Sequence, residues 1–478
     1  MKELLLHTPE GVRDIHLVEA SRKIELQNRI MSIFHSYGFK DVQTPTFEYI
    51  DIFSKERGTV DLKMMYKFFD RDGNILALRP DITPSIARFI ATSMENDGMP
   101  KRICYLGSTF RNWESYTGKL HEFTQAGVEF IGVDSPDADA EMIALIVNSM
   151  LASGLKEFQI DLGQASFFKG ILEETGFDAS YEEELRRLID EKNYIAVEEL
   201  LQSLNINEEH KKILLDLPKF FGSVEVVHQA KKMTTNSTAL KALNRLEEVY
   251  EILKDYSIED YIAFDLGMVS KINYYTGIVF RGFTYGTGVS VVDGGRYDQL
   301  LGQFGKEAPA VGCAFVIDDL MAALERQNIH LPSEQVDTLL LYNQNSRKIA
   351  IGIGESMRAQ NMNIETGLLG QSLEESIAYG KLHQIGGIMN FVTDEIVELI
   401  NLTTDEKSRI AVSDLFDDLD VYEEDHYHDE HCDCGDHEHG GCEDWEDSKD
   451  STASKDYKGC QDCNCGNSAL HEKDGKKS

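Results

Sequence analysis

Two neighbouring segments, 103–111 and 122–131, constrain the fold of this chain more than any other part of its sequence. Apolar and polar residues alternate in both, which predicts two β-strands. The segment between them is polar and contains Gly118, so we expect a long loop that joins the strands as antiparallel neighbours. The fold must therefore contain an antiparallel sheet with this hairpin as one of its parts.

The second strand carries polar residues on the same face as a large apolar one. Phe123, Gln125, Gly127 and Glu129 fall on one face, because successive side chains of a strand point to opposite sides. Gln125 and Glu129 beyond Phe123 suit the floor of a polar pocket. The alternative is a half-exposed sheet whose polar residues are solvated, and the periodicity alone favours that alternative.

The patterns around this hairpin predict an α+β domain over residues 1–327. Segment 167–256 is almost continuously helical, and strand patterns resume after it, so we interpret it as a helical insertion. Other helices are expected at 17–37, 81–95, 137–155 and 318–326, with Asp81 or Thr83 as the cap of the second. Strand patterns occur at 39–47, 65–79 (a hairpin), 158–162, 261–266, 271–281, 288–293 and 311–316.

The rest of the sequence divides into a small module and a tail. After a linker with Pro332, strands and helices alternate over 336–415, which predicts a small α/β domain. The segment 416–478 is rich in acidic, His and Cys residues and is too polar to bury a core, so we expect it to be disordered. Residues 414–450 hold 17 Asp/Glu against one Lys, within a chain whose formal net charge is −36.

Composition and charge exclude several classes of protein. No apolar run approaches the roughly 20 residues that span a bilayer, and the N-terminus lacks a signal-peptide pattern. Only Cys104 and Cys313 lie outside the tail, so we expect no disulfide framework and a cytoplasmic location. Lys and Arg contacts to phosphate supply most non-specific affinity for nucleic acid, which makes an acidic body a poor partner for it. We therefore expect neither a membrane nor nucleic acid as a partner.

Six segments occur in the order found in class II aminoacyl-tRNA synthetases, and they resemble histidyl-tRNA synthetase most closely. They are YGFKDVQTPTFE (37–48), LRPDITPSIAR (78–88), FR (110–111), EFTQAGVEFIG (122–132), INYYTGIVF (272–280) and GGRYDQLLGQFG (294–305) with PAVGCAF (309–315). The resemblance covers about 1–327 and, more weakly, about 336–415, where the family keeps its anticodon-binding domain. It implies a synthetase-like antiparallel sheet core with a helical insertion.

The nucleotide side of that pattern is degraded. The family's third motif ends in Glu-Arg, whose Arg stacks on ATP, and this chain has Asp318 and Asp319 there. The loop of the second motif normally reads Gly-Arg-x-Arg and contacts the distal phosphates, but residues 118–121 read Gly-Lys-Leu-His. Ser-Lys-Ile-Asn at 270–273 replaces Arg-Gly-Leu-Asp of the histidine-specific segment. Among the arginines that would hold a triphosphate, the resemblance leaves only Arg111.

This loss of positive charge is large enough to prevent nucleotide activation. A pair of unit charges about 4 Å apart is worth about 4 kcal/mol at an effective dielectric constant of about 20. An Asp in place of an Arg beside ATP turns attraction into repulsion, and about 1.4 kcal/mol changes an affinity tenfold. Adenylation depends on positive charge placed at the phosphates, so we expect none. The alternative is that Lys119 or Lys271 substitutes for a missing arginine.

The amino-acid side of the pattern is retained. The resemblance implies a histidine pocket lined by Asp81, Thr83, Gln125, Glu129, Tyr274 and Tyr275. Asp81 stands where the family has Glu and keeps its charge. The two carboxylates can hold an α-ammonium group and an imidazole nitrogen, while Tyr and Gln side chains orient the ligand by hydrogen bonds. The chain is therefore expected to bind histidine without activating it.

This combination resembles the family of ATP phosphoribosyltransferase regulatory subunits, the synthetase-like partners of the short-form catalytic subunit in the first step of histidine biosynthesis. The resemblance implies a non-catalytic chain, a homodimer within a hetero-oligomer, that permits catalysis and mediates feedback inhibition by histidine. It implies no cofactor for the body. One alternative is a divergent histidyl-tRNA synthetase, and another is a metal-handling protein with a synthetase-like scaffold.

The tail contains a dense group of residues that bind metals. They are His431, Cys432, Cys434, His437, His439, Cys442, Cys460, Cys463 and Cys465. Thiolates and imidazoles at this density bind zinc or nickel, and because no pair of CxxC knuckles is present we expect loose multivalent binding. The alternative is a disordered acidic tail without metal. Elemental analysis of full-length and 1–415 chains separates the two, since equal, negligible metal in both would reject metal binding.

Overall fold

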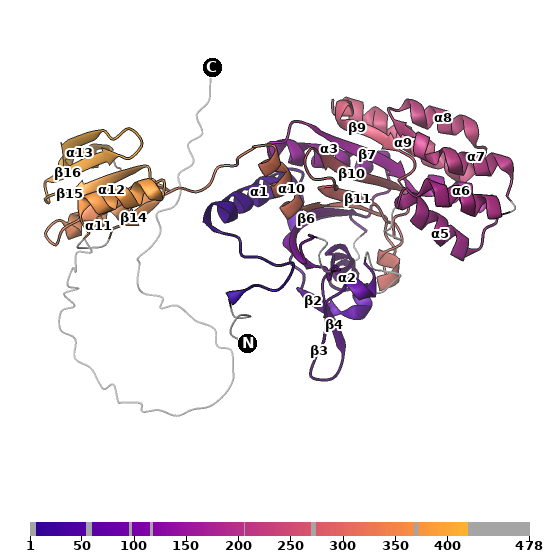
Figure 1. Ribbon diagram of the computed structural model, residues 1–478, viewed down its shortest axis with the longest axis horizontal. Helices are drawn as coiled ribbons and strands as arrows, with labels where there is room; N and C mark the ends of the chain where they lie inside the picture. The colour runs from indigo at the N-terminus through magenta and orange to yellow at the C-terminus, as the bar shows by residue number, and fades with distance from the viewer. Residues whose placement is uncertain are drawn as a thin grey trace, which may run out of the picture. The chain divides into compact units, whose positions relative to one another are not determined.

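The structure, a computed structural model, describes residues 6–53, 60–94, 98–114, 118–204, 206–268, 274–367 and 371–418 (Figure 1). Strands in these ranges form sheets of nine, five and three strands. Helices accompany the largest sheet, in which most neighbouring strands are antiparallel. The predicted α+β class is therefore confirmed. Within the same ranges, no helix is both long and apolar enough to cross a bilayer.

The nine-stranded sheet contains the predicted hairpin. Its order is β1-β5-β6-β12-β11-β10-β7-β9-β8. The strands are β1 (Lys40–Asp41), β5 (Lys101–Phe110), β6 (Glu122–Ile131), β7 (Phe158–Gln164), β8 (Phe221–Gly222), β9 (Ile262–Asp265), β10 (Ile278–Thr284), β11 (Val292–Arg296) and β12 (Ala310–Val316). β5 and β6 pair antiparallel along their full length, from Lys101 opposite Ile131 to Phe110 opposite Glu122. The hairpin is thus confirmed, and β12 covers the other edge of β6.

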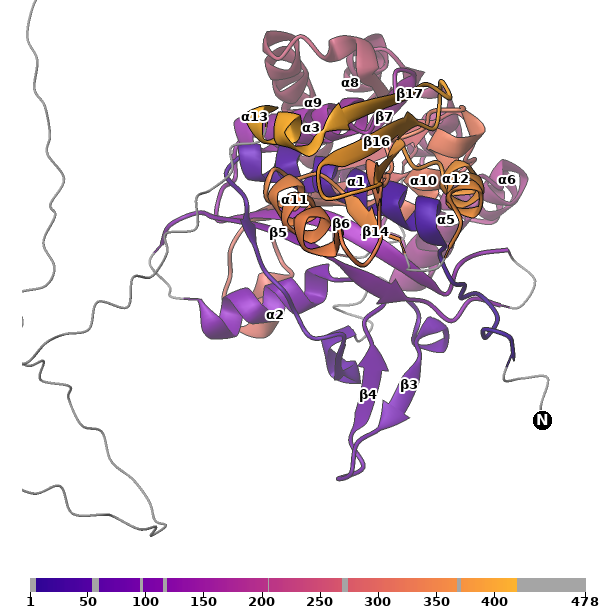
Figure 2. The same cartoon turned by 90° about the vertical axis from the view of Figure 1, so that its left-hand side faces the viewer.

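Three helices, α1 (Leu17–Ser36), α3 (Pro136–Ala152) and α10 (Ile317–Arg326), pack on one face of this sheet (Figures 1 and 2). Leu26, Ile30 and Phe34 of α1 recur every four residues, so they form one stripe, and all three are fully buried. The ring of Phe34 lies 6.2 Å from that of Phe315 on β12. Each such buried side chain contributes about 1.5–3 kcal/mol, which fixes the sheet under α1.

The opposite face of the sheet has a core of its own around α2 (Thr83–Ser93). Alternate residues of the central hairpin enter the two cores. Cys104 and Val128 belong to the core beneath α1 and α3, whereas Tyr105 and Ile131 belong to the core with α2. Strand β6 is therefore buried from both sides, and the face that carries Tyr105 holds the candidate site.

Between β7 and β9 the chain is almost entirely helical, as its sequence pattern predicts (Figure 1). The helices are α4 (Ala165–Glu173), α5 (Ala179–Asp190), α6 (Tyr194–Ser203), α7 (Glu208–Asp216), α8 (Glu225–Met233) and α9 (Ser237–Asp255). Helix α9 starts where the Asn236 side chain accepts a hydrogen bond from Ala239 N. It packs against both α3 and α4, which joins the helical segment to the helices on the sheet.

The remaining strands form two small sheets. The predicted hairpin at 65–79 is present as β3 (Lys67–Phe69) and β4 (Ile75–Leu78), which pair with β2 (Phe47–Tyr49). The module beyond the linker has the order β14-β13-β15-β16-β17. Its elements are β13 (Thr338–Tyr342), α11 (Arg347–Ala359), β14 (Ile364–Thr366), α12 (Leu373–Leu382), β15 (Gly387–Phe391), β16 (Ile396–Asn401), β17 (Lys407–Ala411) and α13 (Val412–Asp418). Short 3₁₀ helices are η2 (Ile50–Phe53), η3 (Leu62–Met64), η4 (Leu217–Lys219), η5 (Glu259–Tyr261) and η6 (Leu301–Phe304).

Candidate functional site

The centre of the candidate site is the carboxyl group of Glu129 on β6. Glu129 is 1% exposed, and every residue of β6 after Glu122 is buried. The alternative of a half-exposed sheet with solvated polar residues is therefore wrong. A polar group buried this deeply needs partners inside the protein.

Three hydroxyl groups supply partners for the Glu129 carboxyl. Thr83 donates to Oε1 over 2.7 Å, Tyr105 donates to the same oxygen over 3.5 Å, and Tyr297 donates to Oε2. Burial raises the pKa of Glu129 to about 8, although the hydroxyl donors oppose this rise. At neutral pH the carboxyl of the empty pocket therefore keeps its proton. Neither Tyr105 nor Tyr297 was among the predicted site residues.

Two glycines leave room for these buried groups. A Cβ atom at Gly127 would lie 2.4 Å from the ring of Tyr105, its partner across the β5–β6 ladder. A Cβ atom at Gly312 on β12 would lie 1.7 Å from Oε2 of Glu129. Both distances are far below a van der Waals contact, so the site requires glycine at both positions.

The start of α2 brings Asp81 and Thr83 to the site instead of capping the helix, so the predicted cap is wrong. The N-cap position is Ile82, and no side chain caps it. Asp81 Oδ1 accepts a hydrogen bond from Ile82 N over 2.8 Å, while the Thr83 hydroxyl is engaged by Glu129. The helix forgoes a cap worth about 1 kcal/mol. The carboxylate of Asp81 instead lies near Glu129, and its negative charge helps to raise the pKa of Glu129.

Tyr274 and Tyr275 form an aromatic wall of the same site. The two rings lie 5.0 Å apart, and Tyr274 also packs edge-on against Tyr297 at 5.5 Å. Burial raises the pKa of both hydroxyls, and the negative charges of Asp81 and Glu129 add to the rise. The two tyrosines therefore remain neutral hydrogen-bonding groups. Residues 269–273, which include Lys271, lie outside the described residues.

Gln125 on β6 has a buried acceptor without a partner among the described residues. The residue is 4% exposed, and its Oε1 makes no hydrogen bond there. Leaving a buried polar atom unpaired costs about 1–3 kcal/mol, which a protein usually avoids. An unpaired buried acceptor on the same face of β6 as Glu129 is the arrangement expected of a group that meets a ligand.

Replacing Gln125 by methionine should separate ligand binding from stability. The side chains are nearly isosteric, and Met removes the unpaired Oε1, so the unfolding temperature of the free protein should stay the same or rise. Affinity for an amino-acid ligand should fall about tenfold, the usual worth of one hydrogen bond in a buried site. Thermal melts and calorimetric titration measure the two effects, and a melting temperature that drops while affinity stays constant would contradict this role.

The side of the site that would hold a nucleotide has mixed charge. Arg111 is half-buried, donates from Nε to Pro80 O over 3.1 Å, and lies 5.2 Å from the ring centre of Phe123. Burial lowers the pKa of Arg111, while the negative charges of Asp81, Asp293 and Asp319 act in the opposite direction. The negative charges of three carboxylates therefore act on the one arginine that the resemblance leaves there.

Asp318 and Asp319, which stand in place of Glu-Arg, have different surroundings. Asp318 pairs with Lys23 over 2.7 Å and accepts a hydrogen bond from Thr124 N over 2.7 Å, so it joins α1 to β6. Asp319 is half-buried, and burial together with the charges of Asp318 and Asp293 raises its pKa. Lys119 and Arg111 are the cations that lower it. Asp319 is thus the acid that faces the nucleotide half.

His121 and Lys119 of the second-motif loop also make contacts with other residues. His121 N donates to Gly11 O over 2.7 Å, and its ring nitrogen Nδ1 lies 2.6 Å from the Tyr66 hydroxyl. Lys119 Nζ lies 4.1 Å from the ring centre of Trp113, a cation–π contact. His121 therefore has a packing role at a position where the family has a phosphate-binding arginine.

Asp81, Thr83, Tyr274 and Tyr275 lie near Glu129, and Arg111 lies near Asp81 and Tyr274. Gln125 lies on the same face of β6, four residues before Glu129. Nothing places a ligand there, so their assignment to histidine remains a prediction. The nine metal-binding residues predicted in the tail, His431 to Cys465, lie outside the described residues, and their prediction remains one as well.

Comparison with known proteins identifies the family. The family model described as histidyl-tRNA synthetase matches residues 11–320. A protein of Acetivibrio thermocellus named ATP phosphoribosyltransferase regulatory subunit is 44% identical over 415 residues, which is 87% of this chain and 99% of that protein. Its namesake from Ruminiclostridium cellulolyticum is 42% identical over 419 residues, 88% of this chain and 99% of its own. Because each match covers 87–88% of the 478 residues, it must include the small module at 336–415.

Solved structures agree with this assignment. A regulatory subunit/histidyl-tRNA synthetase from Bacillus halodurans has a TM-score of 0.73 at 30% identity, covering 80% of this chain and 97% of its own. Histidyl-tRNA synthetase from Nostoc sp. PCC 7120 has the same TM-score at 22% identity, covering 86% and 99%, which shows the shared fold. The chain therefore belongs to the histidyl-tRNA synthetase family and, within it, to the ATP phosphoribosyltransferase regulatory subunits.

Proposed function

We propose that this chain is a non-catalytic regulatory subunit of ATP phosphoribosyltransferase that binds histidine around Glu129 and passes the occupancy of that pocket to a catalytic subunit. The observation that carries the proposal is the contrast between the two halves of the site. The amino-acid half keeps buried acceptors at Glu129 and Gln125. The nucleotide half has Asp319 where the family has a cation.

Histidine suits the chemistry of the amino-acid half. Its α-ammonium group and its imidazole N–H are donors, and the pocket offers acceptors at Asp81, Gln125 and Glu129. Hydrogen bonds to an ionised carboxylate are the stronger kind, so the two acids supply most of the expected affinity. Tyr274 and Tyr275 add flat aromatic surfaces that suit an imidazole ring.

Histidine binding is expected to release a proton from Glu129. In the empty pocket the pKa of Glu129 is about 8, whereas a cationic ligand is held best by the ionised carboxylate. Affinity should therefore rise as the pH increases from about 6.5 to 8, by at most about tenfold per pH unit. Calorimetric titration in buffers of different ionisation enthalpy counts the protons. A count near zero, or an affinity that falls over this range, would contradict the assignment.

The same group affects the stability of the free protein with a definite sign. The pKa of Glu129 is raised from 4.5 to about 8 on folding, so between these values only the folded chain holds the proton. The contribution of Glu129 to stability is therefore complete below about pH 4.5 and is lost as the pH rises through about 8. Histidine should offset this loss, because it pairs with the ionised form.

Mixing the purified chain with a short-form ATP phosphoribosyltransferase catalytic subunit tests the proposed function. We expect a stable complex by sedimentation, a homodimer of this chain within it, and catalytic activity whose inhibition by histidine differs from that of the catalytic subunit alone. A catalytic subunit whose size, activity and histidine inhibition are all unaffected would reject the proposal.

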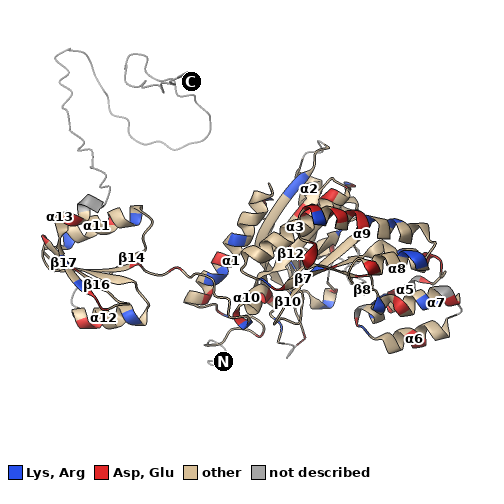
Figure 3. Cartoon of the chain, turned by 90° about the horizontal axis from the view of Figure 1, so that it is seen from above, with Lys and Arg blue, Asp and Glu red and all other residues tan. Residues whose placement is uncertain are grey.

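The second candidate is a divergent histidyl-tRNA synthetase, which Arg111 and the family's fold favour. The charge of the small module disfavours it. Residues 337–412 hold ten Asp/Glu against six Lys/Arg, and Figure 3 shows acidic and basic residues mixed on α11 and α12. Binding a tRNA needs an excess of positive charge. Histidine-dependent exchange between ATP and pyrophosphate discriminates the two, since only a synthetase catalyses it.

A further inference from the structure

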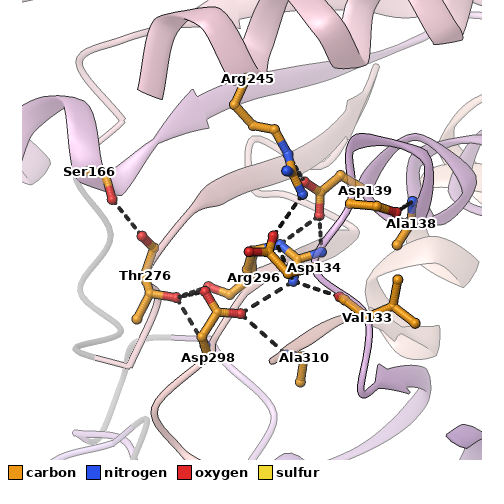
Figure 4. Close-up of polar contacts among 11 residues, drawn as sticks. Val133, Asp134, Ala138, Asp139, Ser166, Arg245, Thr276, Arg296, Asp298 and Ala310 are labelled. Atoms are coloured by element: carbon orange, nitrogen blue, oxygen red, sulfur yellow. Dashed lines mark hydrogen bonds and ion pairs between the residues drawn. The ribbon is translucent and has the colours of Figure 1, made fainter. Parts of the chain in front are cut away.

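We propose that a buried ion-pair network centred on Arg296 positions the histidine pocket relative to the helical segment 165–255, with Arg245 as its link to α9. Figure 4 shows this network, whose residues are not among those named above for the pocket. The inference rests on the proposed function and adds a regulatory route, because it connects the pocket to helices α4 and α9.

The centre of the network is a pair of fully buried charges. Arg296 on β11 donates to Asp139 Oδ1 on α3 from Nε over 2.9 Å and from Nη2 over 2.6 Å. Its Nη1 donates to Val133 O over 3.0 Å and to Asp298 Oδ1 over 3.2 Å. The two side chains are 4% and 1% exposed. Burial raises the pKa of Asp139, whereas the charge of Arg296 lowers it.

On one side, the network holds the two segments that supply the tyrosines of the pocket. Thr276 N donates to Arg296 O over 2.8 Å, and the Thr276 hydroxyl donates to Asp298 Oδ2 over 2.9 Å. Asp298 N donates back to that hydroxyl over 2.9 Å. Thr276 directly follows Tyr274 and Tyr275, and Tyr297, which donates to Glu129, lies between Arg296 and Asp298. The segment with Tyr274 and Tyr275 and the segment with Tyr297 are thus both hydrogen-bonded within the network.

On the other side, the network reaches two helices of segment 165–255. Arg245 of α9 donates from Nε to Asp139 Oδ2 over 2.9 Å and from Nη2 to Asp134 Oδ1 over 3.1 Å. At the start of α4, the Ser166 hydroxyl donates to Thr276 O over 2.6 Å. Asp139 therefore uses one oxygen for the arginine of the sheet and the other for the arginine of α9.

Asp139 is a shared partner, because Arg296 on the sheet and Arg245 on α9 both hold its carboxylate. A buried carboxylate between two guanidinium groups is stable only when the geometry of both contacts is good, because each charge has given up its hydration. A displacement of α9 must move Asp139 or break a contact, and either event changes the restraint on Arg296, Thr276 and Tyr297. Coupling between sites travels through contiguous networks of this kind.

Arg245 is the residue to change, because it is 22% exposed and its loss leaves Asp139 paired with Arg296. We expect Arg245→Met to fold and to bind histidine about 3- to 30-fold more weakly than the wild type. The matched control is Lys231→Met, which removes an ion pair between α8 and Glu247 on the same helix α9 without touching Asp139. This control should keep the wild-type affinity.

Hydrogen exchange supplies a readout that a purely structural role would not change. In the wild type and in Lys231→Met, added histidine should slow amide exchange in α9 (Ser237–Asp255), because a filled pocket fixes the network. In Arg245→Met this slowing should disappear, and Arg245→Lys, which can restore the contact to Asp139, should regain part of it.

The outcomes separate this inference from the function on which it rests. If the wild type binds histidine but amide exchange in α9 does not change, only the coupling is overturned. The same holds if Arg245→Met keeps both the wild-type affinity and the slowing of exchange by histidine. Wild-type protein that does not bind histidine overturns both. The wild-type measurement decides the matter even where a variant does not fold.

Discussion

Replacing Glu129 by glutamine should abolish most histidine binding and leave the fold intact. Glutamine keeps the size of the side chain and an oxygen that accepts from Thr83, but it cannot take the negative charge that a cationic ligand requires. A hydrogen bond to a charged group contributes about 1.5–3 kcal/mol, so the affinity should fall about 10- to 150-fold. Calorimetric titration at pH 8, where ionised Glu129 is well populated, measures the loss.

The Glu129→Gln variant should also be about as stable as the wild type. Since the pKa of Glu129 is about 8, the side chain is neutral near pH 7, and its neutral isostere should shift the melting temperature little. The matched control is Glu141→Gln, which loses an ion pair with Arg102 outside the site and should bind histidine normally. A Glu129→Gln variant with wild-type affinity and no change in proton release would mean that another group holds the ligand.

Replacing Asp319 by arginine should restore affinity for ATP. The change removes one of the three carboxylates that act on Arg111 and adds a cation at the family's own position. A unit charge pair at about 4 Å is worth about 4 kcal/mol at an effective dielectric constant of about 20, so a swing of two charges should raise the affinity at least about 100-fold. Fluorescence or calorimetric titration with ATP measures it.

The control for this variant is Asp260→Arg, which makes the same change in net charge at an exposed residue outside the site. It should leave ATP affinity unchanged, and both variants should bind histidine as the wild type does. Asp318 is unsuitable for the same test, because it pairs with Lys23 and accepts from Thr124 N. Equal ATP affinity in the wild type and in Asp319→Arg would show that charge does not exclude the nucleotide.

The parts of the fold that the sequence predicts well are those with long, regular periodicity. Alternation places Gln125 and Glu129 on one face of β6, and helical spacing aligns Leu26, Ile30 and Phe34 on α1. The long helical stretch before β9 is equally regular. In contrast, the alternation of strands and helices expected over 336–415 does not predict that β15, β16 and β17 follow one another without a helix, since short runs between polar turns carry little signal.

The site is only partly readable from the sequence, because its partners are distant along the chain. Tyr297 lies 168 residues after Glu129, and only the order of strands in the sheet brings them together. The raised pKa of Glu129 follows from burial on both faces of β6, which alternation alone does not reveal. The predicted cap of α2 was wrong for a related reason, as Thr83 has a stronger partner in the site than in its own helix.

The structure also separates two residues that the sequence treats alike. Asp318 and Asp319 replace Glu-Arg together, and both suggest a lost cationic site. Contacts show that Asp318 joins α1 to β6, whereas Lys119 and Arg111 act to lower the pKa of Asp319, which burial raises. Of these two acids, Asp319 is therefore the one that bears on the nucleotide.

Calorimetric titration of the unmodified chain, first with histidine and then with ATP and Mg²⁺, measures whether the site binds the amino acid and excludes the nucleotide. We expect saturable histidine binding that releases a proton, followed by no measurable binding of ATP to the histidine-loaded protein. Tight binding of ATP, or the absence of histidine binding, would contradict it.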